Sequence, residues 1–360
     1  MRRKKIVFVI AGIIILLFVV WGVGSVTANR RIRFANQLGS GINLGNSLEA
    51  TGLRQYKSDA ADLEYEVFWG NPEISREQFS AIRQAGFSSV RIPVTWQDHM
   101  DEEGTVSEIW MNRVTEVVDM ALEENLYVIL DTHHEEWLNL ETEREQEICD
   151  TYRSLWTQIA QQFQEYDEHL LFEGMNEPRL RKSEHEWDAG TPEMRAMVNR
   201  LNEAFIESVR ETGGENRERY LLISAYASGT EEEALEDLVV PEGNIIVAVH
   251  MYLPYSFCQD EDGITQWDDP SGETRAQVEK VFANLERLFI KKHIPVIITE
   301  FGCKDKGNEE ERAAWINFYR KLADAGGIPC FWWDNGSNYQ ILNRNNGKWV
   351  YPKLVEALVK

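Results

Sequence analysis

The feature that most constrains the fold is a regular alternation of short apolar runs with longer amphipathic stretches. The runs are rich in Val, Ile, Leu and Phe, and they occupy residues 41–46, 88–93, 127–134, 170–177, 219–226, 244–252, 295–302 and 328–336. Continuous apolar strands that alternate with helices are typical of a parallel sheet buried on both faces. Eight such units predict an α/β fold closed into a (β/α)8 TIM barrel, a single domain over residues 34–360.

The stretches between the runs have the apolar spacing of amphipathic helices. They predict helices at Ser75–Ala85, Met111–Asn125, Glu145–Tyr166, Met194–Glu211, Thr274–Lys292, Glu309–Ala325 and Pro352–Val359. Glycines at 86, 213–214 and 326–327 end three of these helices shortly before the next apolar run. The chain has no GxGxxG after its first run and no GxxxxGK[ST], which argues against an open nucleotide-binding sheet.

Residues 1–33 form a separate unit. Basic residues at 2–5 precede an apolar stretch at 6–24, and small residues at 26–28 offer a cleavage site. The apolar stretch is near the lower length limit for crossing a bilayer, so residues 1–33 are predicted to be either a signal peptide or a membrane anchor. Both alternatives predict an extracellular domain, secreted or tethered to the outer face of the cell membrane through residues 6–24.

The charge of the chain restricts its partners. The sequence holds 37 Lys and Arg against 60 Asp and Glu, a formal net charge of −23. Such a surface repels phosphate backbones, so no nucleic-acid partner is expected, whereas a neutral polysaccharide meets no such repulsion. We expect a monomer.

The four cysteines, at 149, 258, 303 and 330, show no CxxC spacing and therefore predict no zinc or redox motif. We expect buried thiols. Cys303 and Cys330 lie near neighbouring predicted strands, and their disulfide status stays open.

Two glutamates, Glu177 and Glu300, lie at the ends of two of the apolar runs. The carboxyl ends of parallel strands share one face of a barrel, so the two side chains are expected to converge. An unpaired buried carboxylate costs several kcal/mol, and each of these therefore needs a partner or a function. Two carboxyl groups that face each other across a cleft are the equipment of a glycosidase.

The other strand ends also carry polar or aromatic side chains. These are Asn46, Arg91, His133, His134, Asn176, Tyr226, His250, Tyr252 and Trp333. Trp96 and Trp137, like Trp333, follow predicted strands closely, where an indole can stack on a sugar ring. Trp69, Trp187 and Trp267 fall in predicted loops, and Trp156 and Trp315 fall in helices, where a core position is expected.

The residue types suggest separate chemical roles. Glu300 is the candidate nucleophile, which Arg91 would keep ionised. Glu177 is the candidate acid/base, and we expect burial to raise its pKa in the free enzyme. Asn176 suits the sugar 2-hydroxyl, while Tyr252 suits the nucleophile. His250 would orient either the acid/base or the sugar.

Three other interpretations compete with this one. His133-His134 suggests a metal site, but HExxH is absent and no further ligand follows at ligand spacing, so no metal and no cofactor are expected. Arg91 alone is compatible with a structural ion pair. A carbohydrate-binding barrel without turnover is the third alternative, although it has no need of both carboxylates.

The motifs also resemble a known family. They are GINLGNSLEA (41–50), FWGNP (68–72), AGFSSVRIPVTW (85–96), LYVILDTHHEEW (126–137), LLFEGMNEPR (170–179), VHMYLPYSF (249–257), ITEFGCKDKGNEEER (298–312) and FWWDNG (331–336). Together they resemble glycoside hydrolase family 5, the cellulase family, and within it the endoglucanases of subfamily 4. The resemblance extends from about Phe34 to the C-terminus.

The resemblance implies a catalytic (β/α)8 barrel that hydrolyses β-glucan polysaccharides with retention of configuration and without a cofactor. It implies Glu177 as proton donor, Glu300 as nucleophile, and Arg91, His133, Asn176, His250, Tyr252 and Trp333 around them. The activity implied is that of an endo-β-1,4-glucanase, with xyloglucanase, lichenase, mannanase or xylanase as alternatives on the same machinery. Small departures occur at 47–49, 131–132 and 339–342, where the family usually has Thr-Leu-Asp, Asn-Ile and a Gly-Leu pair.

Overall fold

The computed structural model describes residues 30–267 and 271–360. The predicted signal or anchor segment at 6–24 and the cleavage site at 26–28 lie outside the described residues. In the described part of the chain, no helix is long and apolar enough to cross a membrane. Residues 30–37 are helical and lead directly into the first strand.

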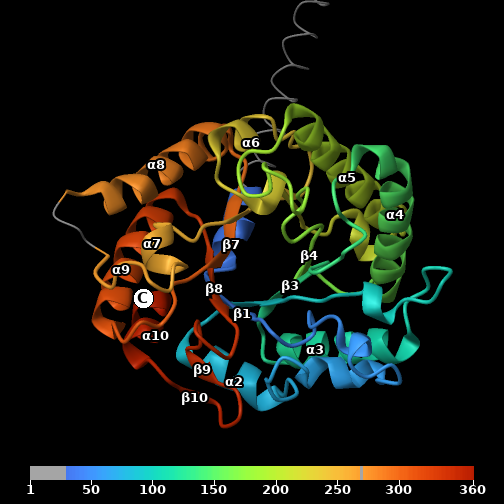
Figure 1. The fold of residues 1–360 in the computed structure, drawn as a ribbon, viewed down its shortest axis with the longest axis horizontal. Helices are drawn as coiled ribbons and strands as arrows, with labels where there is room; N and C mark the ends of the chain where they lie inside the picture. Colours follow the sequence, from blue (N-terminus) through green and yellow to red (C-terminus); the bar gives the residue numbers. More distant parts are fainter. Residues whose placement is uncertain (1–29, 268–270) are drawn as a thin grey trace, which may run out of the picture.

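Eight parallel strands close into a barrel at the centre of the molecule (Figure 1). They are β1 (Ser40–Leu44), β2 (Ser89–Ile92), β3 (Tyr127–Asp131), β4 (Leu170–Glu173), β5 (Leu221–Ser224), β6 (Ile245–His250), β7 (Val296–Phe301) and β8 (Cys330–Asp334). Their order around the barrel follows the sequence, and β8 pairs with β1. Each strand coincides with or overlaps one of the eight apolar runs, which confirms the predicted TIM barrel.

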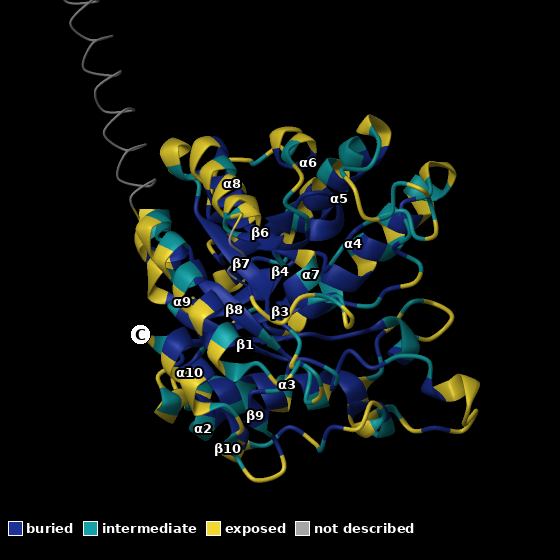
Figure 2. Ribbon diagram, turned by 60° about the vertical axis from the view of Figure 1, so that its left-hand side comes forward, coloured by how far each residue is buried: buried dark blue, intermediate teal, exposed yellow. Residues whose placement is uncertain are grey.

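Helices surround the barrel. They are α2 (Arg76–Ala85), α3 (Glu108–Glu123), α4 (Glu145–Gln162), α5 (Pro192–Glu211), α6 (Glu232–Glu236), α7 (Tyr255–Cys258), α8 (Glu273–Leu288), α9 (Glu309–Gly326) and α10 (Pro352–Val359). A short hairpin of β9 (Leu342–Asn343) and β10 (Lys348–Trp349) follows β8. Figure 2 shows the expected division, with buried strands inside and exposed helix faces outside. The helix over 145–166 ends earlier than predicted, at Gln162, and the one over 274–292 gives way to a 3-10 turn after Leu288.

Alternation along the strands separates two cores. In β3, Val128 and Leu130 pack outward against the helices, whereas Ile129 joins a smaller apolar cluster inside the barrel. That inner cluster forms the floor of the barrel, where the Phe34 and Tyr220 rings stack with centroids 3.6 Å apart. The next inward position of β3 is Asp131, which marks a polar layer above the apolar floor.

The cysteines are free. Cys258, Cys303 and Cys330 are buried, and Cys149 is partly exposed. The expectation of buried thiols is therefore confirmed for three of the four, and Cys303 and Cys330, whose disulfide status the sequence left open, are both free.

Candidate active site

A cavity of about 630 Å³ opens at the carboxyl ends of the strands. Side chains from the ends of five strands line it, and they include His133, His134, Asn176, Glu177, His250, Tyr252, Glu300 and Trp333. These predicted residues are thus brought together in one site. The chain segments 187–188, 227–231 and 253–259, together with Tyr339, complete the wall.

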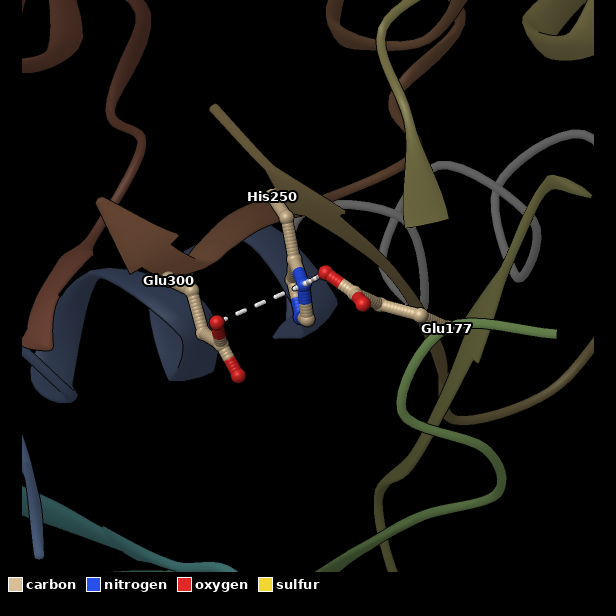
Figure 3. A group of neighbouring side chains, drawn as sticks. All are labelled: Glu177, His250 and Glu300. Atoms are coloured by element: carbon tan, nitrogen blue, oxygen red, sulfur yellow. Dashed lines mark hydrogen bonds and ion pairs between the residues drawn. The ribbon is translucent and has the colours of Figure 1, made fainter. Parts of the chain in front are cut away.

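The two predicted carboxylates converge at the base of this cavity. One oxygen of Glu177, one of Glu300 and a ring nitrogen of His250 all lie within 4.8 Å of one another (Figure 3). His250 reaches this place because the register of β6 against β7 shifts after Val249, which sets His250 opposite Glu300. Carboxyl groups about 5–5.5 Å apart are typical of retaining glycosidases, whereas inverting enzymes need about 6.5–9.5 Å. The spacing therefore suits a retaining mechanism.

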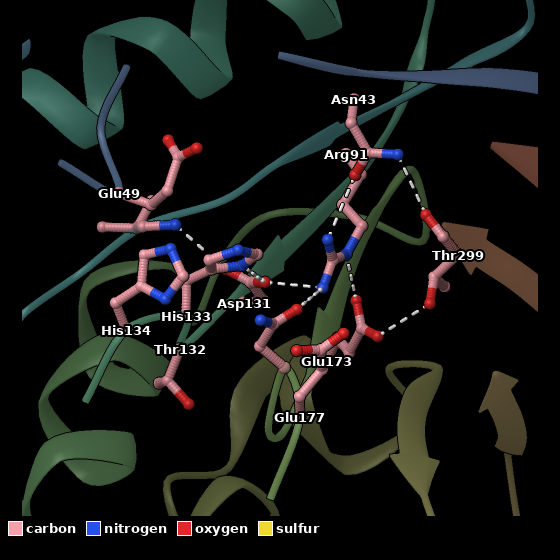
Figure 4. Close-up of polar contacts among 12 residues, drawn as sticks. Asn43, Glu49, Arg91, Asp131, Thr132, His133, His134, Glu173, Glu177 and Thr299 are labelled. Atoms are coloured by element: carbon pink, nitrogen blue, oxygen red, sulfur yellow. Dashed lines mark hydrogen bonds and ion pairs between the residues drawn. The ribbon is translucent and has the colours of Figure 1, made fainter. Parts of the chain in front are cut away.

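Arg91 organises the polar layer beneath the cavity. Its side chain is fully buried, and every nitrogen of the guanidinium faces a side-chain oxygen (Figure 4). The partners are Glu300 at 2.7 Å, Asp131 at 2.7 Å, Asn176 at 3.0 Å, Asn43 at 3.1 Å, and Glu173, which binds Nε. Arg91 therefore belongs to the site and is not an isolated core ion pair.

Two donors bind the carboxyl group of Glu300. Arg91 donates to its Oε1, and the Tyr252 hydroxyl donates to Oε2 over 2.8 Å. Burial, followed by the charge of Glu300, raises the pKa of Tyr252 well above its usual value, so the phenol keeps its proton. A carboxylate fixed in this way points a charged oxygen into the cavity, as a nucleophile must.

The electrostatics of Glu177 differ from our prediction. Its side chain is 21% exposed. Burial raises the pKa of Glu177, but the hydrogen bond from His250 at 3.0 Å and the charges of His250 and Arg179 outweigh burial and lower the pKa to about 2. The expectation of a raised pKa is therefore wrong for this state of the site.

The pKa of His250, the hydrogen-bond partner of Glu177, is shifted in the opposite direction. Burial lowers the pKa of His250, but the charge of Glu300 and the bond to Glu177 reverse this and raise it overall. The raised pKa of His250 and the lowered pKa of Glu177 therefore favour a shared proton on the imidazole. A group of this kind can give up a proton once the hydrogen-bond partners of Glu177 change.

His133 and His134 form the wall next to β3. Burial, followed by the charge of Arg91, lowers the pKa of His133 to about 3. Burial, followed by the charge of His133, likewise lowers the pKa of His134 to about 3. Both rings are therefore neutral, and Nδ1 of His133 lies 2.7 Å from Asp131. Neutral imidazoles suit hydrogen bonds to sugar hydroxyls.

The tryptophans predicted to stack on sugar take different positions. Trp333 lines the cavity, and its ring is parallel to that of His133 with centroids 5.8 Å apart. Trp187 also lines it and is 62% exposed, with the Arg179 guanidinium 3.9 Å from its ring centroid. The prediction for Trp96 is wrong, because its indole is completely buried and donates to the carbonyl of Asp131.

Four other predicted residues take positions away from the cavity wall. Trp137 is half-buried, and its Nε1 donates to Glu135 over 2.7 Å. Asn46 has a φ of 58°, and its carbonyl accepts from Asn71. Tyr226 is buried and positions the 180–190 loop through bonds to Leu180 and His185. Trp267 is buried, whereas Trp156 and Trp315 are core residues as expected.

Sequence reasoning missed Glu173, Asp131 and Arg179 as parts of the site. Glu173 and Asp131 sit at inward positions of β4 and β3, as the alternation with Leu171 and Ile129 indicates, so a strict period-two reading would have found them. Arg179 binds Oε2 of Glu177 at 3.3 Å from a loop, where no sequence period exists to reveal it.

The Glu177, His250 and Glu300 group is also the one set of His, Cys, Asp and Glu in the described residues with metal-ligand spacing. Its oxygens already have donors, and the buried guanidinium of Arg91 lies 2.7 Å from Glu300. A second cation beside that charge is disfavoured. The absence of a catalytic metal stays a prediction.

Known proteins resemble this chain over most of its length. Residues 51–339 match the family model described as cellulase, glycosyl hydrolase family 5. Endoglucanase A of Ruminococcus albus is 37% identical over 94% of both chains. Endoglucanase A of Clostridium longisporum is 37% identical over 90% of this chain, which spans 64% of that relative's length.

Solved structures of family 5 enzymes also resemble this chain. A family 5 xyloglucan-specific endo-β-1,4-glucanase from a metagenomic library, in complex with cellotriose, has a TM-score of 0.87 and 39% identity, covering 92% of this chain and 99% of its own. A broad-specificity endoglucanase of subfamily 4 from Clostridium acetobutylicum has a TM-score of 0.86 and 37% identity, covering 91% and 99%.

Proposed function

Because the chain belongs to glycosyl hydrolase family 5, the cellulase family, we propose that its cavity hydrolyses internal β-1,4-glucosidic bonds of β-glucans. The observation that carries this conclusion is the spacing of Glu177 and Glu300, whose oxygens and the ring of His250 lie within 4.8 Å of one another. The protein is an endo-β-1,4-glucanase that acts by a retaining double displacement.

In the first step, Glu300 attacks the anomeric carbon and forms a covalent glycosyl-enzyme. Arg91 and Tyr252 hold the attacking carboxylate in place and ionised, so little reorganisation is needed as the bond forms. Asn176, whose Oδ1 accepts from Arg91, is fixed with its amide NH₂ free to donate to the sugar 2-hydroxyl. Trp333 offers an indole face to the sugar ring.

The leaving oxygen must receive a proton in the same step. We infer that a bound sugar covers the exposed part of Glu177, which makes its charge more costly and draws the shared proton from His250 onto the carboxyl. Glu177 then protonates the leaving oxygen. In the second step it accepts a proton from water, which attacks the glycosyl-enzyme and releases Glu300.

Substitution of each carboxylate tests these roles separately. Glu300→Ala removes the nucleophile and should abolish turnover of carboxymethylcellulose and of an aryl cellobioside alike. Glu177→Ala should abolish turnover of carboxymethylcellulose but spare glycosyl transfer from an aryl cellobioside with a good leaving group, which needs no proton. Glu207→Ala, on the exposed face of α5 beside Arg153, serves as a control for the substitution itself.

Azide distinguishes the two roles chemically. It should rescue Glu300→Ala by direct attack and give the inverted glycosyl azide, whereas Glu177→Ala should give the retained product. Substantial carboxymethylcellulose activity in either variant would overturn the assignment.

Preference among β-glucans follows from the walls of the cavity. Similar solved structures include a broad-specificity endoglucanase of subfamily 4, and a xyloglucan-specific endo-β-1,4-glucanase and a lichenase described as members of family 5. Initial rates on carboxymethylcellulose, xyloglucan, mixed-linkage glucan, mannan and xylan measure the preference. Negligible action on β-1,4-glucan would replace our first choice by one of the alternatives.

We further propose that the enzyme is a monomer outside the cytoplasm, exported by residues 1–33 as a signal or membrane anchor. The basic start, the apolar stretch 6–24 and the small residues at 26–28 support this. N-terminal sequencing of the protein from the culture medium and from the membrane fraction distinguishes cleavage from anchoring. Light scattering of the purified enzyme tests the monomer.

A further inference from the structure

Three buried carboxylates share one guanidinium beneath the cavity. Asp131, Glu173 and Glu300 all contact Arg91, and the side chains of Asp131 and Glu173 are completely buried. If all three were ionised, Arg91 would balance only one of the three negative charges in this buried layer. Such charges cost several kcal/mol each, and buried groups avoid the cost by taking up a proton.

Other ionisable side chains around this layer supply only part of the missing positive charge. His133 faces it from β3, Glu177 from the loop after β4, and His250 and Tyr252 from β6. His133 is neutral. Protonated His250 lies 3.0 Å from Glu177 and 3.6 Å from Glu300, and Arg179 binds Glu177 at 3.3 Å, so with Arg91 three positive charges face four carboxyl groups. One of the three carboxyl groups is therefore best held as a neutral acid.

The hydrogen bonds show which group has room for a proton. Asp131 accepts the Val94 N–H on Oδ1, and on Oδ2 it faces both Arg91 and His133. Both of its oxygens are therefore occupied by N–H donors or a charged partner. Donors of this kind stabilise the ionised form of a carboxyl group. Burial raises the pKa of Asp131 as well, so it is the hydrogen bonds that distinguish Asp131 from Glu173.

Glu173 differs in this respect. Its Oε2 binds Nε of Arg91, but its Oε1 faces only the hydroxyl of Thr299, at 3.0 Å. A hydroxyl can accept a hydrogen bond as well as donate one. In the structure the Thr299 hydroxyl donates to Oε1; once this hydroxyl turns to accept, Oε1 of Glu173 can carry the proton. Burial, the largest influence on this carboxyl, raises the pKa of Glu173 in spite of Arg91.

We propose that Glu173 is a neutral carboxylic acid in the working enzyme, donating to Thr299 and accepting from Arg91. In this form it acts as a positioning residue. It fixes the Nε edge of the guanidinium, and so aims Nη1 at Glu300, without competing with the nucleophile for positive charge. The charge of Arg91 is then divided between Asp131 and Glu300 alone.

Infrared difference spectroscopy tests the protonation directly. In Glu173→Gln the amide takes the place of the neutral acid, with its NH₂ toward Thr299 and its oxygen toward Arg91. The spectrum of wild type minus Glu173→Gln at pH 8 should contain the deuterium-sensitive carbonyl band of a protonated carboxyl group. Burial raises the pKa of Glu49 and of Glu135 to about 7, and their contributions cancel in the difference.

A matched control is available in Glu66, a buried carboxylate bound by Arg113 through two bonds of 2.8 Å. Unlike Arg91, Arg113 binds only one buried carboxylate among the described residues. Glu66→Gln should therefore remove carboxylate bands from the spectrum and lower the melting temperature by several degrees. Glu173→Gln should lower the melting temperature less. Carboxylate bands in the Glu173 difference spectrum would overturn the proposal.

The acid limb of kcat/KM supplies a second readout, since it reports ionisation of the nucleophile in the free enzyme. It should stay in place in Glu173→Gln, where a neutral group replaces a neutral group. It should move to lower pH in the Asp131→Asn, Glu173→Gln double variant, which leaves Arg91 to Glu300. A shift in Glu173→Gln alone, equal to that of the double variant, would show that Glu173 is ionised.

Thr299→Val provides an independent variant, because it removes the acceptor and keeps the carboxyl. It should shift the protonated-acid band, and an unshifted band would contradict the Thr299 contact. If Glu173→Gln does not fold, the proposal also fails, since the amide fits where a neutral acid fits. The kinetic readout rests on the proposed double displacement while the infrared readout does not, so failure of one is distinguishable from failure of the other.

Discussion

Replacement of Arg91 by Lys is the most informative single perturbation of the site. It keeps one positive charge but replaces a planar group whose three nitrogens meet five oxygen partners by a single ammonium. A lysine nitrogen carries three donors at one point and cannot span the distance from Glu173 to Glu300 and Asp131 at once. At least two charge-assisted hydrogen bonds are therefore lost.

The expected cost follows from these contacts. Hydrogen bonds to charged groups contribute about 1.5–3 kcal/mol each, so the loss of two lowers the free energy of unfolding by about 3–6 kcal/mol. At about 2 °C per kcal/mol for a domain of this size, the melting temperature should fall by at least about 6 °C. Weaker stabilisation of the anionic nucleophile should also move the acid limb of kcat/KM to higher pH.

Calorimetry and a pH–rate profile on an aryl cellobioside measure both effects. Arg113→Lys is the matched control, because Arg113 pairs with Glu66 away from the cavity. It should lose stability while its acid limb stays in place. A melting temperature within about 2 °C of wild type, combined with an unmoved acid limb in Arg91→Lys, would refute the role assigned to Arg91.

Four further predictions follow from other parts of the structure. His250→Asn should lower kcat and move the alkaline limb of kcat/KM to lower pH, because the variant lacks the imidazole whose raised pKa retains the proton shared with Glu177. An unmoved alkaline limb would contradict the shared proton. Burial lowers the pKa of His99 to about 4 in spite of its bond to Asp62. Below about pH 6.5 the unfolded state binds a proton at His99 that the folded state does not bind, so the free energy of unfolding falls as the pH drops. The difference in the free energy of unfolding between wild type and His99→Gln should therefore shrink by about 2 kcal/mol between pH 7 and pH 5. A constant difference in urea titrations would show that His99 is protonated in the fold. Trp333→Ala should weaken cello-oligosaccharide binding roughly two- to tenfold, the loss of one aromatic contact of about 0.5–1.5 kcal/mol, measured by calorimetry on Glu300→Ala, and unchanged affinity would remove Trp333 from the sugar site. Exhaustive chelation should leave kcat unchanged, and loss of activity restored by a divalent cation would revive the metal alternative.

The barrel itself could be predicted because its information is local. Each strand is a continuous apolar run, and the eight runs are separated by helix-forming stretches, so chain order alone determines the closed sheet. The two carboxylates could also be predicted from chain order, because strand ends of one barrel share a face. This is why Glu177 and Glu300 were found at positions far apart in the sequence.

The rest depends on which way a side chain turns and on what it meets. Trp96 lies just past the end of β2, and Trp333 lies near the end of β8, but Trp96 turns into the core and donates to a carbonyl of β3. The lowered pKa of Glu177 depends on His250, which arrives from a different strand through a register shift. Neither outcome has a signal in the spacing of the sequence.

The floor of the barrel has a practical consequence. Phe34 closes the floor against Tyr220, and Ser40 at the start of β1 binds the carbonyl of Leu358 near the end of the chain. Residue 30 and the last helix therefore both lie toward the amino ends of the strands, opposite the cavity. A support, a reporter or a carbohydrate-binding module joined at either of these ends would leave the cavity facing outward, and a long polymer could enter it from solution unobstructed by the attachment.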